Sequence, residues 1–339
     1  ISVGIPFCPH RLCSKRSRNG TQAVPYSFAD GCIFEPTYFK SGNVRCSIIV
    51  NCPLSIVNFF PFPFRFIGQV GANSKEGGGQ ESYIEKQFYK LPLQVMTPFY
   101  QDQDGTVFLY LLNPSGGVLD YDNFKIEVTV KNAAKAWIGT PSATKIYKRR
   151  DENAPVARQK NLFHLEKGSV LEYCPDEIIP YANSMFSQEN HFYLSEDSTL
   201  LTWDILSAGR ALRGEVFQFE RYASQTFLYM DGKPIVVDKM VIDPQETDIR
   251  NLQCMRGYVY AATVYAYAGA CDETLAERLA EEAEGYEDGI LGVSLVTEKL
   301  LIIKILGNHA YAVFEEMHRV WDILRRNILG KEAVRIRKF

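Results

Sequence analysis

The chain has 339 residues, 46% of them hydrophobic, which is enough for a sizeable core and excludes an intrinsically disordered protein. Its 37 lysines and arginines nearly balance 40 aspartates and glutamates, giving a formal net charge of −3 at pH 7. No basic excess therefore points to nucleic acid as a partner. The 19 tyrosines and 21 phenylalanines favour β-structure.

Residues 1–80 differ in texture from the rest, because they combine clustered Cys, Pro and Phe with the glycine-rich stretch KEGGGQ. We expect a poorly ordered extension of unknown role here, followed by a folded domain over residues 83–339. The stretch Cys46–Phe64 carries no charge, so a membrane-tethered variant is an alternative. Pro53 and Pro61 interrupt this stretch, and we therefore expect no membrane span.

Eight cysteines are present, and five of them lie in the first 52 residues. The remaining three, Cys174, Cys254 and Cys271, are scattered over a large body and make no disulfide framework. The sequence therefore predicts a reducing compartment, namely the cytoplasm.

From about Tyr83 onwards the pattern indicates short strands. The segment FKIEVTV (residues 124–130) alternates strictly between apolar and polar residues, which is typical of a half-buried strand. The clearest hairpin is TFLYMDGKPIVVDKMVI (residues 226–242), with Asp231 and Gly232 at its turn. Strands follow one another with short turns and almost no helix before residue 272. This pattern predicts a mainly β fold of many antiparallel strands.

Two helices are expected in the C-terminal part. Asp272 can cap the first, whose apolar face consists of Leu275, Leu279 and Ala283. Two short strands follow, and Asn308 then opens a longer helix that ends at Gly330. One face of this longer helix is apolar and typical of a core contact: Val313, Met317, Val320, Trp321, Leu324 and Ile328.

The stretch LLNPSGGVLDYDNF (residues 111–124) resembles a phosphate-binding loop only at first sight. Such a loop needs glycines before a helix N-terminus, whereas a strand follows Gly116 and Gly117 here. The chain also has no His-Glu-x-x-His motif and no Gly-x-Ser-x-Gly motif. We therefore interpret the glycines as a tight turn and expect no enzymatic activity.

Three aspartates have apolar neighbours in the sequence: Asp122, Asp204 in LLTWDIL, and Asp238 after PIVV. Burying a carboxylate is costly unless it is hydrogen-bonded, paired or bound to a cation. Two interpretations stay open at this point. Each acid can be held by backbone donors or a basic partner, or several can serve a cation.

Six ordered segments resemble the urease accessory protein family called UreD or UreH, from about Tyr83 to the C-terminus, roughly three quarters of the chain. They are PFYQDQDGTVFLYLLNPSGGVLDYDNFKIEV, TPSATKIYK, LEYCPDEIIPYANS, WDILSAGRALRGEVFQF, DGKPIVVDKMVIDP and VWDILRRNILGK. The resemblance implies a twisted β-helical body with two C-terminal helices, and a non-enzymatic role as a urease maturation factor. It also implies three partners: a UreF-type protein, the UreG-type GTPase that this protein recruits, and apo-urease.

The resemblance further implies that nickel passes through an internal channel, with no permanently bound cofactor. The family's channel positions correspond to Asp122, Thr144, Asp204 and Asp238. One departure concerns Tyr121, which stands where many members have glycine and cannot adopt glycine dihedrals cheaply. The alternative is a β-helical carbohydrate-active enzyme that uses paired carboxylates.

Overall fold

The computed structural model describes residues 64–74, 80–151, 153–246, 248 and 255–334, together with the short strands β1 (Thr37–Tyr38) and β2 (Val44–Arg45), which pair with each other. Almost all of the expected extension, including residues 46–63, lies outside the described residues. Among the described residues, no helix combines the length and apolar character needed to cross a bilayer.

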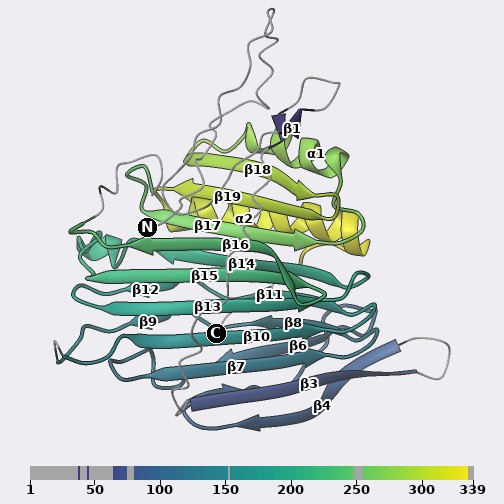
Figure 1. The fold of residues 1–339 in the computed structure, drawn as a ribbon, viewed down its shortest axis with the longest axis horizontal. Coiled ribbons are helices and arrows are strands. Elements are labelled where there is room, and N and C mark those ends of the chain that lie inside the picture. Colours follow the sequence, from purple (N-terminus) through teal and green to yellow (C-terminus); the bar gives the residue numbers. More distant parts are fainter. Residues whose placement is uncertain are drawn as a thin grey trace, which may run out of the picture.

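The first of two large sheets has seven strands in the order β16-β15-β13-β10-β7-β3-β4 (Figure 1). The ladders from β3 through β7, β10 and β13 to β15 are parallel, whereas β4 and β16 join at the edges as antiparallel strands. The strands are β3 (Phe64–Ser74), β4 (Gln80–Tyr89), β7 (Asn123–Val130), β10 (Ala157–Leu165), β13 (Met185–Leu194), β15 (Arg221–Met230) and β16 (Lys233–Ile242).

The second sheet follows the order β18-β19-β17-β14-β11-β8-β6-β5, with β9 and β12 beside this path. The pairs β6–β8, β8–β11 and β11–β14 are parallel, and the pairs from β14 onwards to β18 are antiparallel. The strands are β5 (Gln94–Val95), β6 (Val107–Leu112), β8 (Lys135–Gly139), β9 (Thr144–Ile146), β11 (Val170–Cys174), β12 (Ile178–Pro180), β14 (Thr199–Ser207), β17 (Tyr260–Tyr267), β18 (Gly289–Thr297) and β19 (Leu300–Gly307).

The expectation of many antiparallel strands was wrong for the central part of the body. From β7 to β15 the long strands alternate between the two sheets. Each strand therefore pairs with one that the chain forms only after it has crossed to the other sheet and returned. Such pairs are necessarily parallel. An alternating apolar pattern fixes which face is buried and not the direction of the neighbour. The hairpin β15–β16 is antiparallel as predicted, and positive φ at Asp231 (51°) and Gly232 (74°) shapes its turn.

The main core lies between the two sheets and contains buried residues from both. Strand β7 contributes one of its faces to this core. The residues of that face are all at most 4% exposed: Phe124, Ile126, Val128 and Val130. A second core lies on the other face of the ten-stranded sheet, under the helices α1 (Glu273–Ala283) and α2 (Ala310–Leu324). Figure 1 shows α2 lying along β17 and β19.

Both helices lie in the predicted parts of the chain, but α2 begins at Ala310 with His309 as its N-cap, and not at Asn308 as predicted. The carboxylate of Asp272 accepts a hydrogen bond of 2.9 Å from the backbone N–H of Leu275 and caps α1. The predicted apolar stripe of α2 is buried, from Val313 to Leu324, and a π-helical turn (Arg325–Leu329) continues it to Gly330, which has a φ of 67°. A short 3₁₀ turn (Ala211–Arg213) precedes β15.

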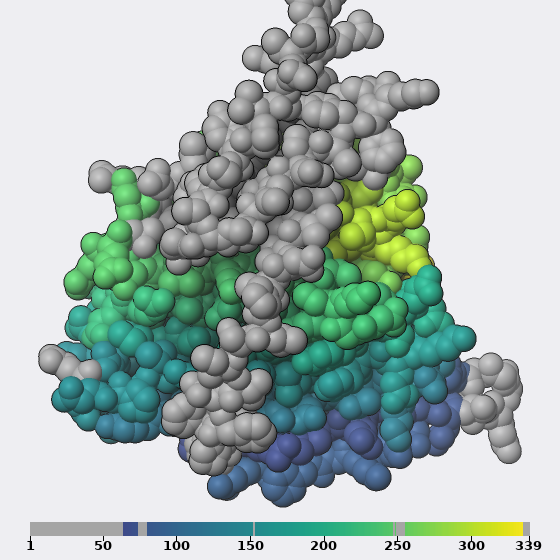
Figure 2. All heavy atoms as spheres, viewed as in Figure 1, coloured from purple at the N-terminus to yellow at the C-terminus, as the bar shows by residue number. Residues whose placement is uncertain are grey.

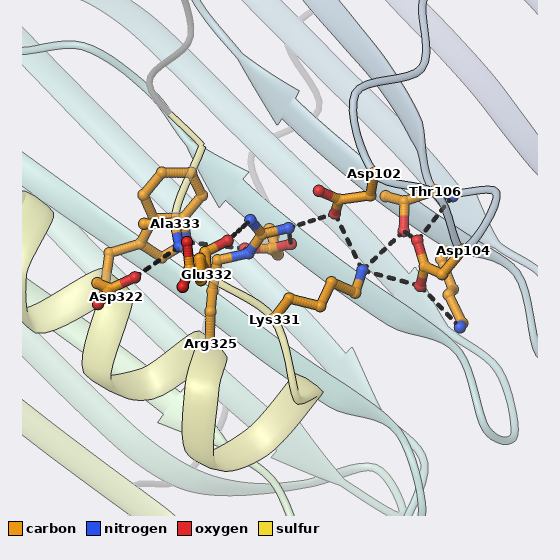
Figure 3. A network of polar contacts seen from close by, with 11 residues as sticks. Asp102, Asp104, Thr106, Asp322, Arg325, Lys331, Glu332 and Ala333 are labelled. Carbon is orange, nitrogen blue, oxygen red and sulfur yellow. Dashed lines mark hydrogen bonds and ion pairs between the residues drawn. The ribbon is translucent and has the colours of Figure 1, made fainter.

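A buried ionic network ties the end of α2 to the body (Figure 3). Arg325 is 0% exposed, and its guanidinium pairs with Glu172 of β11 at 3.1 Å and with Asp102. Lys331 reaches the same aspartate at 3.0 Å and Asp104 at 2.8 Å. Buried ion pairs therefore hold the C-terminal segment against the body, and no local sequence pattern predicted these pairs.

The seven-stranded sheet begins at Phe64, ahead of the boundary at Tyr83 that the sequence texture suggested. Strand β3 lies between β7 and β4, and its residues Phe66 and Val70 are 4% and 1% exposed. In the space-filling view, β3 and β4 form the purple and blue end of the molecule, and the yellow α2 region lies toward the other end (Figure 2).

Candidate functional site

A group of polar side chains replaces apolar ones at the centre of the space between the two sheets. Each is at most 8% exposed, in a region where buried polar groups need hydrogen-bond partners. The amide of Asn161 donates to the side-chain oxygen of Asn190 at 2.7 Å, and these two residues come from neighbouring parallel strands. The group, which we call the polar seam, consists of Asn161, Gln188, Asn190, Thr202, Ser224, Thr226, Asp238 and Thr263.

One end of the polar seam borders a cavity of about 20 Å³. This volume holds about one water molecule or one largely dehydrated ion. Strand β14 contributes Asp204 to its wall, and β16 contributes Asp238 from the opposite sheet. The full lining consists of Asp204, Leu206, Tyr222, Ser224, Thr226, Asp238, Met240, Ala261, Thr263 and Tyr265.

Asp204 is held by neutral donors. The hydroxyl of Ser224 donates to its Oδ2 at 2.6 Å, and the amide of Gln188 lies 3.4 Å from each carboxylate oxygen. Burial raises the pKa of Asp204, and the nearby charge of Asp238 adds to this, although the two donors oppose the shift. The site therefore disfavours a lone negative charge on this acid and favours any arrangement that brings a cation or a proton to it.

Asp238 has a different environment. It is 8% exposed, and Lys304 of β19 places its ammonium nitrogen 2.8 Å from Oδ2. The hydroxyl of Tyr265 donates to the same oxygen at 2.9 Å. Burial, followed by the charge of Asp238, raises the pKa of Tyr265 well above its usual value, so its hydroxyl remains a donor.

The cavity also contains an unsatisfied hydroxyl. Tyr222 is 0% exposed and lines the cavity, and its hydroxyl makes no hydrogen bond of normal geometry to the described residues, although the side chain of Ser224 lies beside it. A buried hydroxyl without a normal hydrogen bond indicates a site for a water molecule or an ion. Together with two carboxylates and the hydroxyls of Ser224 and Thr263, it makes an oxygen-rich wall.

This wall fits a weakly held divalent cation better than a permanent metal centre. Carboxylate, hydroxyl and water ligands bind borderline ions less tightly than sets of imidazoles and thiolates do. Over the part of the chain that the structure describes, no three or more His, Cys, Asp or Glu side chains converge as a metal-binding group. The chemistry of the cavity is thus compatible with an ion that enters and leaves.

The other two predicted channel residues lie elsewhere. Asp122 precedes β7, and its Oδ2 accepts a hydrogen bond of 2.8 Å from the backbone N–H of Leu119. Thr144 opens β9 opposite Ile178 of β12. Neither residue lines the cavity. The structure therefore brings Asp204 and Asp238 together and keeps Asp122 and Thr144 apart from them.

The glycine pair acts as the tight turn that the sequence suggested. Gly116 has a φ of 80°, and a Cβ on Gly117 would lie 2.5 Å from the backbone oxygen of Lys145. Tyr121 does adopt a positive φ, of 70°, and its hydroxyl donates to Asp151 at 2.7 Å. The departure from glycine is therefore accommodated in the same left-handed region.

Sequence reasoning missed several residues of the cavity. Tyr222 and Tyr265 line the cavity, and Gln188 donates to Asp204 beside it. All three sit at inward positions of strands that mix apolar and polar inward residues, and nothing local distinguishes them. Lys304 could have been recognised from the sequence, because it is a single charge inside the apolar run LLIIKIL. A lone lysine in such a run needs a buried partner, and that partner is Asp238.

The chain is similar to known proteins over most of its length. A family model described as UreD urease accessory protein matches residues 68–338. The chain is similar to "Urease accessory protein UreD" of Bacillus sp. (strain TB-90), with 31% identity over 77% of this chain and 94% of that protein. It is similar to the protein of the same name from Actinomyces naeslundii, with 30% identity over 77% of this chain and 95% of that protein. Such identity over nearly the whole length of these relatives, together with the family model, means that the chain belongs to the UreD family of urease accessory proteins.

Proposed function

We propose that this chain is a non-catalytic maturation factor for urease that helps to deliver nickel to the enzyme through the polar seam. The observation that carries the proposal is the cavity between the two sheets, where Asp204 and Asp238 face the buried hydroxyl of Tyr222. An oxygen-lined site of this size suits an ion in transit and no larger substrate.

The family membership supports the remaining parts of the proposal. As a scaffold in the cytoplasm, the chain joins apo-urease to a UreF-type protein and, through it, to a UreG-type GTPase. The path of β7 to β15, which alternates between the sheets with parallel pairing, supports description of the body as a twisted β-helix. Asp122 and Thr144 lie along this body outside the cavity, and we keep them as candidate positions on the route that an ion takes to or from it.

The alternative of a carbohydrate-active enzyme has less support. Glycoside hydrolysis needs two carboxylates on either side of a bound sugar. Asp204 and Asp238 border a cavity of about 20 Å³, which is far too small for a sugar ring.

The proposal is tested in cells that express urease and all of its accessory proteins. We replace Asp204 and Asp238 by Asn, singly and together, and measure nickel-dependent urease activity beside co-purification of the partners. Glu196→Gln is the matched control, because its carboxylate is 85% exposed. We expect the double variant to retain its partners and lose activation. Full activation by a stable double variant would contradict the proposal.

A further inference from the structure

Lys304 brings a positive charge to a cavity whose lining residues include two carboxylates and no cation. It lies in β19, opposite Thr263 of β17 in the register. Its neighbours Ile303 and Ile305 belong to the core under the helices, so the alternation of the strand directs Lys304 to the opposite side, between the sheets. Its side chain is 20% exposed.

The ammonium of Lys304 already contacts Asp238, one of the two carboxylates that line the cavity. It lies 2.8 Å from Oδ2, the same oxygen that accepts a hydrogen bond from Tyr265. A divalent ion bound between the two aspartates would therefore meet a positive charge already in contact with one of its ligands. Inside a protein such repulsion is strong, because the effective dielectric constant is low.

The second aspartate does not compensate for this. The hydrogen bonds to Asp204 come from neutral donors, among them Ser224 and Gln188. Lys304 therefore balances the charge of one of the two carboxylates that line the cavity. A site that retains a divalent ion tightly offers it more uncompensated carboxylate charge.

We propose that Lys304 acts as a resident cation that keeps the Asp204–Asp238 pair from retaining a divalent ion. This inference rests on the proposed function and adds a control element to the same site. The ammonium is a compact charge on a flexible four-carbon stem, so it can move aside when an ion enters. It then returns to Asp238 when the ion leaves, which shortens the stay of the ion.

A purely structural ion pair is the competing explanation. In both accounts, loss of the ammonium leaves Asp238 buried without its partner and lowers stability. Only the resident-cation account predicts that the same change raises the affinity for a divalent ion. The affinity for nickel therefore separates the two explanations, whereas a melting temperature of the metal-free protein does not.

The experiment measures binding of nickel chloride to the full chain by equilibrium dialysis, with thermal unfolding alongside. Lys304→Met removes the charge and keeps the stem, Lys304→Gln keeps a hydrogen-bond donor, and Lys304→Arg keeps the charge. We expect the Met and Gln variants to bind nickel at least about ten-fold more tightly than the wild type, and the Arg variant to resemble it. Nickel should raise the melting temperature of the Met variant most.

Asp238→Asn in the Lys304→Met background should abolish the gain. One outcome would overturn the role of Lys304 and leave the proposed function intact. In it, the Met and Gln variants bind nickel as the wild type does, whereas Asp204→Asn or Asp238→Asn, made in the wild-type chain, weakens nickel binding. If no change at Asp204 or Asp238 alters nickel binding in any background, the cavity is not a nickel site, and the proposed function fails together with this inference. If the Met variant does not fold, the Gln variant decides the question.

Discussion

The indole N–H of Trp321 donates a hydrogen bond of 2.7 Å to Oε2 of Glu172, and both side chains are at most 5% exposed. The glutamate also pairs with the fully buried Arg325, so a residue of α2 and the turn that follows it meet one carboxylate of β11. This contact joins the helical layer to the ten-stranded sheet. It is stabilising only while every charge in the group has its partner.

Glu172→Gln should therefore destabilise the whole body. The change leaves the guanidinium of Arg325 short of one buried counter-charge, and we expect a loss of about 3–5 kcal/mol. Urea unfolding followed by tryptophan fluorescence measures it. The control is Glu332→Gln, because that carboxylate is 74% exposed and pairs with Arg326 at the surface. Equal stability of the two variants would show that the buried pair contributes nothing.

Trp321→Ala removes a large buried side chain as well as the hydrogen bond to Glu172. The expected loss is about 3–5 kcal/mol, because the cavity left behind is only partly refilled. Trp321→Phe retains most of the packing and should cost less. An unchanged melting curve for the alanine variant would mean that α2 is not an integral part of the core.

A chain that starts at Tyr83 lacks β3, which lies between β7 and β4 in the seven-stranded sheet. It exposes one side of β7 and loses the buried Phe66 and Val70. We expect no cooperative thermal transition near that of the full chain. Calorimetry of both lengths tests this, and a shortened chain with the same transition would place β3 outside the folding unit.

Gly117→Ala should destabilise the turn between β6 and β7. The new Cβ would lie 2.5 Å from the backbone oxygen of Lys145, which cannot move as freely as the end of a side chain. We expect a loss of about 1–3 kcal/mol in urea unfolding. Gly269→Ala is the matched control, since a Cβ there meets nothing within 4 Å and its φ is not positive. Similar losses in both variants would refute the steric explanation.

Acid should weaken one contact on the outer face of the seven-stranded sheet. The hydrogen bond from His191, together with Lys160, lowers the pKa of Glu189 from 4.5 to about 2. Because the pKa is lower in the folded state, the contact stabilises the protein above about pH 4.5, and this contribution disappears as the pH falls toward 2. Glu189→Gln should therefore flatten the pH dependence of stability in this window. The carboxylate is 39% exposed, so the effect is expected to be small.

Part of this structure could be predicted from the sequence alone. Strict alternation predicted β7 and its buried face, Asp272 predicted the start of α1, and Asp231 with Gly232 predicted the turn of β15–β16. These features depend on neighbours along the chain. The parallel pairing could not be predicted, because the same alternation suits either direction of the neighbouring strand.

The candidate site shows the same division. Asp204 and Asp238 stand out in the sequence as acids in apolar strands, and the structure brings them to one cavity. Their meeting depends on the packing of two sheets, which no spacing in the sequence encodes. Lys304 completes the site from a strand far away along the chain, and Tyr222 does so from β15, between the two acids in the sequence. The roles of both residues emerge only from the contacts between the sheets.

Occupation of the cavity between Asp204 and Asp238 by a nickel ion underlies both the proposed function and the proposed role of Lys304. Anomalous X-ray scattering at the nickel absorption edge tests it most directly, with crystals of the full chain soaked in millimolar nickel chloride. We expect an anomalous peak inside the cavity, within bonding distance of both carboxylates and stronger in Lys304→Met crystals. Nickel found only on the surface, with none in the cavity of either protein, would contradict it.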